Sequence, residues 1–275
     1  MSKTVGVLGC GWLGFPLAKS LIREGISVRG TTTSQDRITD LEAAGIQPFC
    51  LQLTAEEIQG PIASFLQGLD ALVLNIPPGL RSNPETRYTP KIIHLLDRLE
   101  QSDCKRLIYV SSTSVYGNKQ GSVDEDTPPE PDSESGRQLL EAEQAVLSRS
   151  GLKTLVLRFG GLLARDRHPV RFLSGRSGMQ NGRDPVNLIH REDCIRLIRA
   201  GLQDPELTGL INGVYPEHPV KSEYYTREAK AAGIPPPQYE DNAQPATPKI
   251  VGSNHPLGAQ KAFLRGIYTF DRSDL

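Results

Sequence analysis

The sequence predicts an α/β protein built on a Rossmann-type doubly wound parallel sheet, with a small C-terminal substrate lobe. An apolar strand-like run at residues 4–8 ends in a glycine-rich turn that leads directly into a helix. Strand-like and helix-like segments then alternate up to residue 163, which is typical of a parallel sheet covered by helices on both faces. Beyond residue 163 the alternation gives way to stretches rich in Arg, Gly and Pro.

The glycine-rich turn has the Gly-x-Gly-x-x-Gly spacing of a dinucleotide-binding motif, formed by Gly9, Gly11 and Gly14. Gly9 permits a tight turn, Gly11 lets the backbone approach a pyrophosphate, and Gly14 lets the helix pack against the strand. The helix N-terminus adds unpaired N–H groups and partial positive charge. Trp12 and Leu13, which lie between the last two glycines, are assigned to the same cofactor site, and the bulk of Trp12 is expected to pack.

Apolar periodicity places the other elements. Strands are expected at residues 26–31, 46–53, 70–78, 105–112 and 154–163, helices at 89–100 and 135–150, a short strand entering a helix at 186–202, and a helix-like segment around 221–232. We therefore assign residues 1–163 to the dinucleotide-binding domain, with residues 186–203 returning to it. Residues 164–185 and 204–275 form the small lobe, and ligands are expected at the carboxyl ends of the strands.

Composition narrows the class of protein. The 275 residues carry a net charge of −1 with both signs interspersed, so nothing points to nucleic acid. No apolar run is long enough for a membrane span, and no secretory signal layout is visible, so a cytoplasmic location is expected. The four cysteines, Cys10, Cys50, Cys104 and Cys194, are widely spaced, which predicts free thiols and no metal site.

Four further motifs follow the glycine turn in order: SSTSVYG at 111–117, DEDTPPEP at 124–131, LRFGGLL at 157–163 and VNLIHRED at 186–193. With these motifs, the chain resembles the extended short-chain dehydrogenase/reductases, the NAD-dependent epimerase/dehydratase proteins. The resemblance covers nearly the whole chain. One departure is that extended members carry Gly-x-x-Gly-x-x-Gly, which requires a glycine where this chain has Leu8.

The resemblance also implies catalytic residues. Ser112, four residues before the tyrosine of VYG, corresponds to the residue that polarises the substrate. The family's acid/base is a tyrosine in a Tyr-x-x-x-Lys motif, whose lysine lowers the tyrosine pKa. Alignment with SESGRQL places Ser135 at the tyrosine position and Leu139, beside the cofactor, at the lysine position, so the usual pair is missing. Tyr116 is a candidate displaced acid, although shaping the pocket is the more ordinary role for it.

The end of the second strand bears on which nicotinamide cofactor is bound. Thr32 stands where an Asp would bind both ribose hydroxyls of NAD. Without that carboxylate, donors at Thr31, Thr32, Thr33 and Ser34 and the charge of Arg37 or Arg29 favour the 2′-phosphate of NADP, with NAD as the alternative. Asn75, Ile76 and Pro77 match the family's cofactor contact at the end of the fourth strand.

Two functions remain open. One is an oxidoreductase or epimerase acting on a small polar substrate, either sugar-like or anionic. The basic loop of Arg165, Arg167, His168 and Arg171 would suit an anionic one. The other is a non-catalytic NADP-binding sensor. The resemblance implies that His190 has a structural or cleft-lining role and is not a base.

Overall fold

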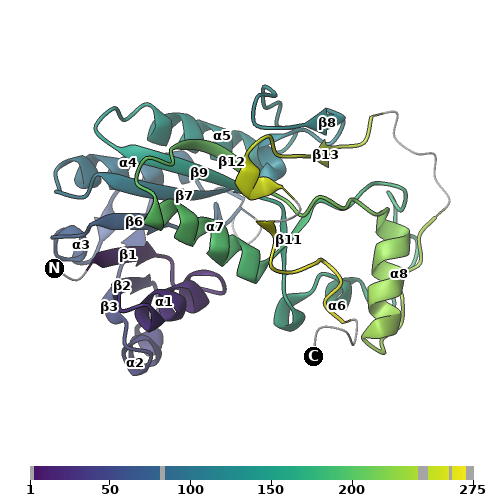
Figure 1. Cartoon of the computed structure of the whole chain (residues 1–275), viewed down its shortest axis with the longest axis horizontal. Coiled ribbons are helices and arrows are strands. Elements are labelled where there is room, and N and C mark those ends of the chain that lie inside the picture. Colours follow the sequence, from purple (N-terminus) through teal and green to yellow (C-terminus); the bar gives the residue numbers. More distant parts are fainter. Residues whose placement is uncertain (1–2, 81–83, 241–246, 260–261, 271–275) are drawn as a thin grey trace. The chain divides into compact units, whose positions relative to one another are not determined.

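The computed structural model describes residues 3–80, 84–240, 247–259 and 262–270, and it confirms the predicted fold class (Figure 1). Its centre is a seven-stranded sheet in the order β12-β9-β7-β6-β1-β2-β3. In this sheet β1 is parallel to β2 and β6, β2 is parallel to β3, and β6 is parallel to β7. The central sheet consists of β1 (Thr4–Leu8), β2 (Ser27–Thr32), β3 (Gln47–Cys50), β6 (Ala71–Leu74), β7 (Arg106–Ser112), β9 (Lys153–Phe159) and β12 (Gly209–Gly213).

The helices are α1 (Gly14–Arg23), α2 (Ile38–Ala43), α3 (Ile62–Leu66), α4 (Tyr88–Glu100), α5 (Glu134–Leu147), α6 (Val170–Leu173), α7 (Arg191–Gln203) and α8 (Lys221–Ala231). Short strands pair outside the central sheet: β4 (Gln52–Leu53) with β5 (Ile58–Gln59), β8 (Ser122–Val123) with β13 (Ile250–Val251), and β10 (Gly161–Leu163) with β11 (Leu188–His190). Short 3₁₀ turns lie at η1 (Gln35–Arg37), η2 (Thr113–Val115), η3 (Arg165–Arg167) and η4 (Pro256–Gly258).

Helices cover both faces of the sheet, as two neighbouring residues of β7 illustrate. The Tyr109 hydroxyl donates to the Tyr88 hydroxyl of α4 at 3.2 Å. Ile108 points the other way, toward α7, where a Cβ on Gly201 would come within 2.9 Å of its side chain. Successive side chains of a strand point to opposite faces, so α4 and α7 lie on opposite sides.

The strand order reverses at β1, because β2 and β3 follow it on one side and β6, β7 and β9 on the other. In open α/β sheets this switch point is where ligands bind, beyond the carboxyl ends of the strands. Gly9 follows β1 and Asn75 follows β6, so these two residues mark the place in this chain.

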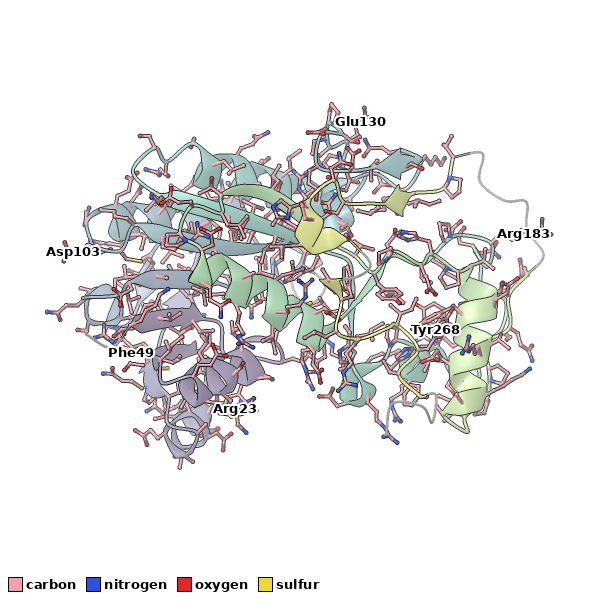
Figure 2. All side chains as sticks on the ribbon, viewed as in Figure 1. Arg23, Phe49, Asp103, Glu130, Arg183 and Tyr268 are labelled. Atoms are coloured by element: carbon pink, nitrogen blue, oxygen red, sulfur yellow. The ribbon has the colours of Figure 1, made fainter. Side chains whose placement is uncertain are left out.

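Contacts divide the chain into two compact units. Unit 1 comprises residues 1–112, 133–157 and 195–210, and unit 2 comprises residues 113–132, 158–194 and 211–275. Unit 2 has its own core, in which Leu163, Val170, Tyr224 and Ile267 are buried together. On its C-terminal segment Tyr268 lies beside α8, where the Arg227 guanidinium stands 4.0 Å from its ring centroid (Figure 2).

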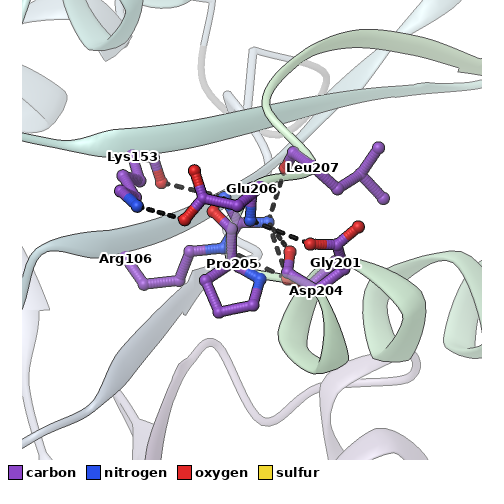
Figure 3. Close-up of polar contacts among 7 residues, drawn as sticks. All are labelled: Arg106, Lys153, Gly201, Asp204, Pro205, Glu206 and Leu207. Carbon is purple, nitrogen blue, oxygen red and sulfur yellow. Dashed lines mark hydrogen bonds and ion pairs between the residues drawn. The ribbon is translucent and has the colours of Figure 1, made fainter.

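Within unit 1, Arg106 fastens the C-terminal end of α7 to β7 (Figure 3). Its guanidinium donates to the backbone oxygens of Gly201 at 2.6 Å and Leu207 at 2.7 Å, and also to that of Lys153 at 3.1 Å. A cation at this end of a helix satisfies carbonyls that have no partner within the helix.

Several elements differ from the predicted ones. The predicted strand at 46–53 forms β3 and β4, which belong to different sheets, and the predicted strand at 70–78 covers only Ala71–Leu74. The segment 154–163 forms two strands, because at Gly160 the chain leaves β9 and joins β11. A Cβ at Gly160 would lie 2.7 Å from the Asn187 backbone oxygen, so this crossing needs glycine. The seventh strand of the central sheet, β12, was not predicted, because its sequence GLING carries no alternating apolar pattern.

Candidate functional site

The turn after β1 has the tight geometry that its first and third glycines predict. Gly9 adopts φ = 105°, and a Cβ there would lie 2.4 Å from the backbone oxygen of Asn75. A Cβ at Gly14 would lie 2.1 Å from the Gly9 oxygen. These distances are shorter than a carbon–oxygen contact allows, so β1, β6 and α1 approach this closely only because both positions are glycine.

The middle glycine faces open space. A Cβ at Gly11 would meet no protein atom within 4 Å, and the residue is exposed. α1 begins just beyond it, its N-cap Leu13 makes no side-chain capping bond, and its first turn holds no acidic residue. A helix N-terminus of this kind fits a pyrophosphate. Trp12 is half-buried, and Leu13, at 3 % exposure, packs into the core.

Thr31, at the end of β2, is hydrogen-bonded to the glycine turn through both its side chain and its backbone. Its hydroxyl accepts from the Gly9 N–H at 2.9 Å, and its backbone oxygen accepts from the Cys10 N–H at 2.9 Å. Thr31 is 3 % exposed, and its hydroxyl is hydrogen-bonded to the turn. Contact between Thr31 and a nucleotide stays a prediction. Burial raises the pKa of the Cys10 thiol to about 12, which makes it a packing group.

Polar residues follow β2 as predicted. The Thr32 hydroxyl accepts from the Ser34 N–H at 3.1 Å, and Thr33 and Ser34 are exposed. Arg37 pairs with Asp40 at 3.2 Å, and its guanidinium stands 5.9 Å from the Phe15 ring centroid in the first turn of α1. An exposed pair of this kind is weak and leaves the Arg37 charge able to meet a second anion.

Arg29, the alternative phosphate partner, has another role. Its Nη1 donates to the backbone oxygens of Ser64 at 3.1 Å and Phe65 at 3.0 Å, at the end of α3. The guanidinium is therefore held at α3, which removes Arg29 from the candidates for the 2′-phosphate.

At the end of β6, Asn75 braces the glycine turn. Its Nδ2 donates to the Gly9 oxygen at 3.2 Å. The next carbonyl, of Ile76, accepts from the Tyr88 hydroxyl at 3.0 Å, and Pro77 is exposed. Asn75 thus joins the carboxyl ends of β1 and β6 at the switch point, and Ile76 and Pro77 continue the chain beyond β6.

The first turns of α5 contain Ser135 and Leu139, the residues that align with the family's tyrosine and lysine. Ser133 caps the helix, its hydroxyl accepting from the Gly136 N–H at 3.1 Å. Ser135 and Leu139 are one turn apart on one face; Ser135 is half-buried and Leu139 is 4 % exposed. The tyrosines of unit 1, Tyr88 and Tyr109, are fully buried and hydrogen-bonded to one another.

One turn beyond Leu139, Glu143 is 1 % exposed and accepts from the Ser111 hydroxyl at 2.5 Å. Sequence patterns gave no sign of this buried pair. Ser111 lies on the α4 and α5 face of β7, and Ser112 on the other. The first two serines of SSTSVYG therefore have different environments: Ser111 is hydrogen-bonded to Glu143, and Ser112 is half-buried at the strand end.

Tyr116 is fully buried in unit 2. Its hydroxyl donates to the Asp124 backbone oxygen at 2.6 Å, and Arg158 Nη1 donates to it at 2.7 Å. Burial raises the Tyr116 pKa, while Arg158 opposes this effect. A phenol so engaged is a poor general acid at neutral pH, so shaping unit 2 is the role that these contacts support.

The predicted basic loop has two parts. Arg165, Arg167 and Arg171 are exposed. His168 is fully buried, its Nε2 lies 2.9 Å from the Tyr224 hydroxyl, and burial lowers its pKa to about 4. His190 accepts from the Glu192 N–H at 3.3 Å, and burial lowers its pKa too.

Sequence reasoning missed Lys249 and the role of Asn187. Lys249 Nζ donates to the backbone oxygen of Tyr116 at 2.8 Å, inside the turn of SSTSVYG. Asn187, the second residue of VNLIHRED, donates from its side-chain amide to the backbone oxygen of Lys249, which directly precedes β13. Lys249 lies in a segment with no recognisable motif, so only the fold connects it with the motif.

Comparison with known proteins agrees with this geometry. A family model described as NAD(P)H-binding matches residues 9–205. Protein YeeZ of Escherichia coli K12 is 36% identical over 251 residues, which is 90% of this chain and 91% of YeeZ. An Arabidopsis thaliana chloroplastic homolog of the epimerase family protein SDR39U1 is 27% identical over 79% of this chain and 67% of its own length.

Among solved structures, the UDP-glucuronic acid 4-epimerase of Bacillus cereus, in complex with NAD, superposes with a TM-score of 0.77 over 98% of this chain and 94% of its own, at 17% identity. This likeness supports the fold, and the predicted resemblance to epimerase/dehydratase proteins is confirmed. In the described part of the chain, no helix has both the length and the apolar character of a membrane span.

Proposed function

This chain belongs to the NAD(P)H-binding family, and we propose that it holds a nicotinamide dinucleotide at the turn between β1 and α1. The observation that carries the proposal is the open space at Gly11, at the switch point of the sheet and before an uncapped helix N-terminus. The pyrophosphate lies over the backbone of Gly11, and Asn75 keeps the turn in shape for it.

The preferred cofactor in this proposal is NADP. No carboxylate stands at Thr32, and the exposed hydroxyls of Thr33 and Ser34 and the Arg37 guanidinium are the groups that meet the 2′-phosphate. NAD is the alternative, because no arginine follows β2 directly.

The proposed chemistry is oxidoreduction or epimerisation of a small polar substrate. A bound nicotinamide supplies hydride transfer. Ser112 hydrogen-bonds the substrate, and Ser135 holds a water for the proton that the family's tyrosine carries. Leu139 offers apolar surface and neither donates nor accepts. Support comes from the Bacillus cereus epimerase, which is described in complex with UDP-glucuronic acid and NAD.

A specific observation favours the second candidate, a non-catalytic NADP-binding sensor. Leu139 is 4 % exposed and stands at the aligned lysine position, and neither tyrosine of unit 1 is accessible. A cofactor site without these groups binds nucleotide without ordinary turnover.

A calorimetric titration of NADPH tests the shared premise. Gly11→Val puts a branched side chain into the open space and is expected to weaken binding at least about tenfold, or 1.4 kcal/mol. Gly151→Val is the matched control, since a Cβ at Gly151 also meets nothing within 4 Å. Equal affinity in both variants overturns the proposed site.

A further inference from the structure

The segment around β13 lies along the turn that follows β7. The Thr247 hydroxyl donates to the Lys119 backbone oxygen at 2.7 Å, and β13 pairs in parallel with β8, with Ile250 opposite Ser122. Lys249 stands between these contacts. The fold therefore places Lys249 beside the SSTSVYG turn, although more than a hundred residues separate the two in sequence.

Asn187 fixes the backbone of Lys249 from the other side. Its Nδ2 donates to the Lys249 oxygen at 3.0 Å, and its Oδ1 accepts from the Val251 N–H at 2.8 Å. One side-chain amide thus bonds the backbone on both sides of Ile250, the first residue of β13. Such paired bonds fix position better than a single bond, so the backbone at Lys249 is held in place where the chain enters β13.

The ammonium group of Lys249 has carbonyl partners only. Its Nζ donates to the backbone oxygens of Tyr116 at 2.8 Å and Thr113 at 3.2 Å. Among the residues that the structure describes, no carboxylate pairs with it within 4 Å. Lys221, which pairs with Asp184 at 3.1 Å, repels it, and Asp132 attracts it from farther away.

These surroundings leave a positive charge incompletely compensated. Burial lowers the pKa of Lys249, which means that the charged form is partly desolvated. A partly buried cation is costly unless a counter-charge accompanies it, and proteins ordinarily supply a carboxylate. Here two carbonyl dipoles stand in that place. An ammonium has three donors, and an anion bound at the third completes the set.

We propose that Lys249 is an anion-binding residue of unit 2, and that its ligand is the phosphate or carboxylate group of the small substrate. Identifying the ligand as the substrate rests on the proposed function, whereas anion binding at Lys249 does not. Thr113 and Tyr116 position the ammonium through their carbonyl groups, and Asn187 positions the strand.

A purely structural role is the competing interpretation, in which Lys249 only closes the turn over residues 113–116. Both interpretations predict that removing the lysine destabilises the protein. They differ in the response to added anions, because a structural lysine already has all its partners.

Amine acetylation followed by peptide mass spectrometry separates the two without any substitution. The labelling rate at Lys249 is measured alone, with inorganic pyrophosphate, and with malonate as the carboxylate probe. Lys119, an exposed lysine of the same turn, is the internal control. We expect at least about threefold slower labelling of Lys249 with one probe and an unchanged rate at Lys119, since a bound anion keeps the amine charged.

Calorimetry with the same probe gives the second measurement, on protein saturated with NADPH so that the glycine turn is filled. Lys249→Gln is expected to lose affinity at least about tenfold, while Lys249→Arg and Lys119→Gln stay within about threefold of the parent. If Lys249→Gln does not fold, Lys249→Arg and the labelling result decide. Absence of protection by either probe, or equal protection of Lys119, overturns the inference. Failure of NADPH to bind overturns the proposed function instead.

Discussion

The Thr31 hydroxyl accepts a hydrogen bond from the Gly9 backbone N–H at 2.9 Å, which joins the end of β2 to the glycine turn after β1. The first glycine of the motif therefore depends on a side chain 22 residues away in sequence. Only glycine fits at position 9, because the Asn75 backbone comes so close to it, so β2 and β6 together shape the turn.

Thr31→Val removes this bond while keeping the shape of the side chain. We expect the free energy of unfolding to fall by about 1–2 kcal/mol, because the Gly9 N–H loses its acceptor. NADPH affinity falls as well, since the turn is no longer fixed. Urea denaturation measures the first effect and calorimetry the second. Thr208→Val, at an exposed position outside the proposed site, is the control, and an equal loss in both variants contradicts this account.

Gly9→Ala tests the close approach separately from backbone strain. Gly9 and Gly25 both have positive φ, at 105° and 78°, but a Cβ at Gly25 meets nothing within 4 Å. Gly25→Ala carries only strain and is expected to cost about 1 kcal/mol. Gly9→Ala adds the collision with Asn75 and is expected to cost about 2 kcal/mol more. Similar midpoints in urea for the two variants show that the turn relaxes.

The glycine turn and the sheet were predictable because their signals are local. Spacing identifies Gly9, Gly11 and Gly14, and apolar runs identify the first strands. The partners of the turn were not predictable in the same way. Thr31 was assigned to the nucleotide because it ends a strand, and only the parallel pairing of β1 with β2 reveals that its hydroxyl points to Gly9.

Cofactor preference depends on Arg37 and Thr32. Arg37→Gln is expected to weaken NADPH binding by about tenfold and leave NADH binding unchanged, because only NADPH has a 2′-phosphate. Thr32→Asp is expected to reverse the preference, since a carboxylate repels that phosphate and accepts from a free ribose hydroxyl. Arg23→Gln is the control, because Arg23 lies in the last turn of α1, at the opposite end of the helix from the glycine turn. Tighter binding of NADH than NADPH by the parent protein refutes the assignment.

Cysteine labelling reports on the integrity of the turn. Burial raises the pKa of Cys10 to about 12 and that of Cys104 to about 11, so both thiols stay protonated at neutral pH. Cys194 is buried, whereas Cys50 is half-buried. We expect iodoacetamide to modify Cys50 first in the folded protein and all four cysteines in urea, as followed by mass spectrometry. Rapid modification of Cys10 indicates that the turn opens.

The candidate site shows the same limit of sequence reasoning as the turn. SSTSVYG located Ser112 and Tyr116, because the motif is contiguous. It gave no sign that Ser111 is committed to Glu143, nor that Lys249 stands beside Tyr116. Both contacts join residues distant in sequence, and neither belongs to a periodic pattern.

The last prediction concerns the aligned pair on α5. Leu139→Lys places an ammonium at a position that is 4 % exposed, and we expect the free energy of unfolding to fall by about 2–4 kcal/mol. Leu139→Met keeps the apolar character and is expected to cost less than about 1.5 kcal/mol.

Because Leu139 neither donates nor lowers the pKa of a neighbour, we expect no epimerisation of UDP-glucose or UDP-glucuronic acid by the parent protein in the presence of NADP or NAD. Product analysis by NMR measures this. Ser135→Ala then distinguishes the two candidate functions once a substrate is known, since an enzyme that uses a water on Ser135 loses turnover and keeps NADPH affinity. Rapid turnover of either sugar nucleotide by the parent protein shows that another group carries the proton, and the assignment of Ser135 and Leu139 to the missing pair is then wrong.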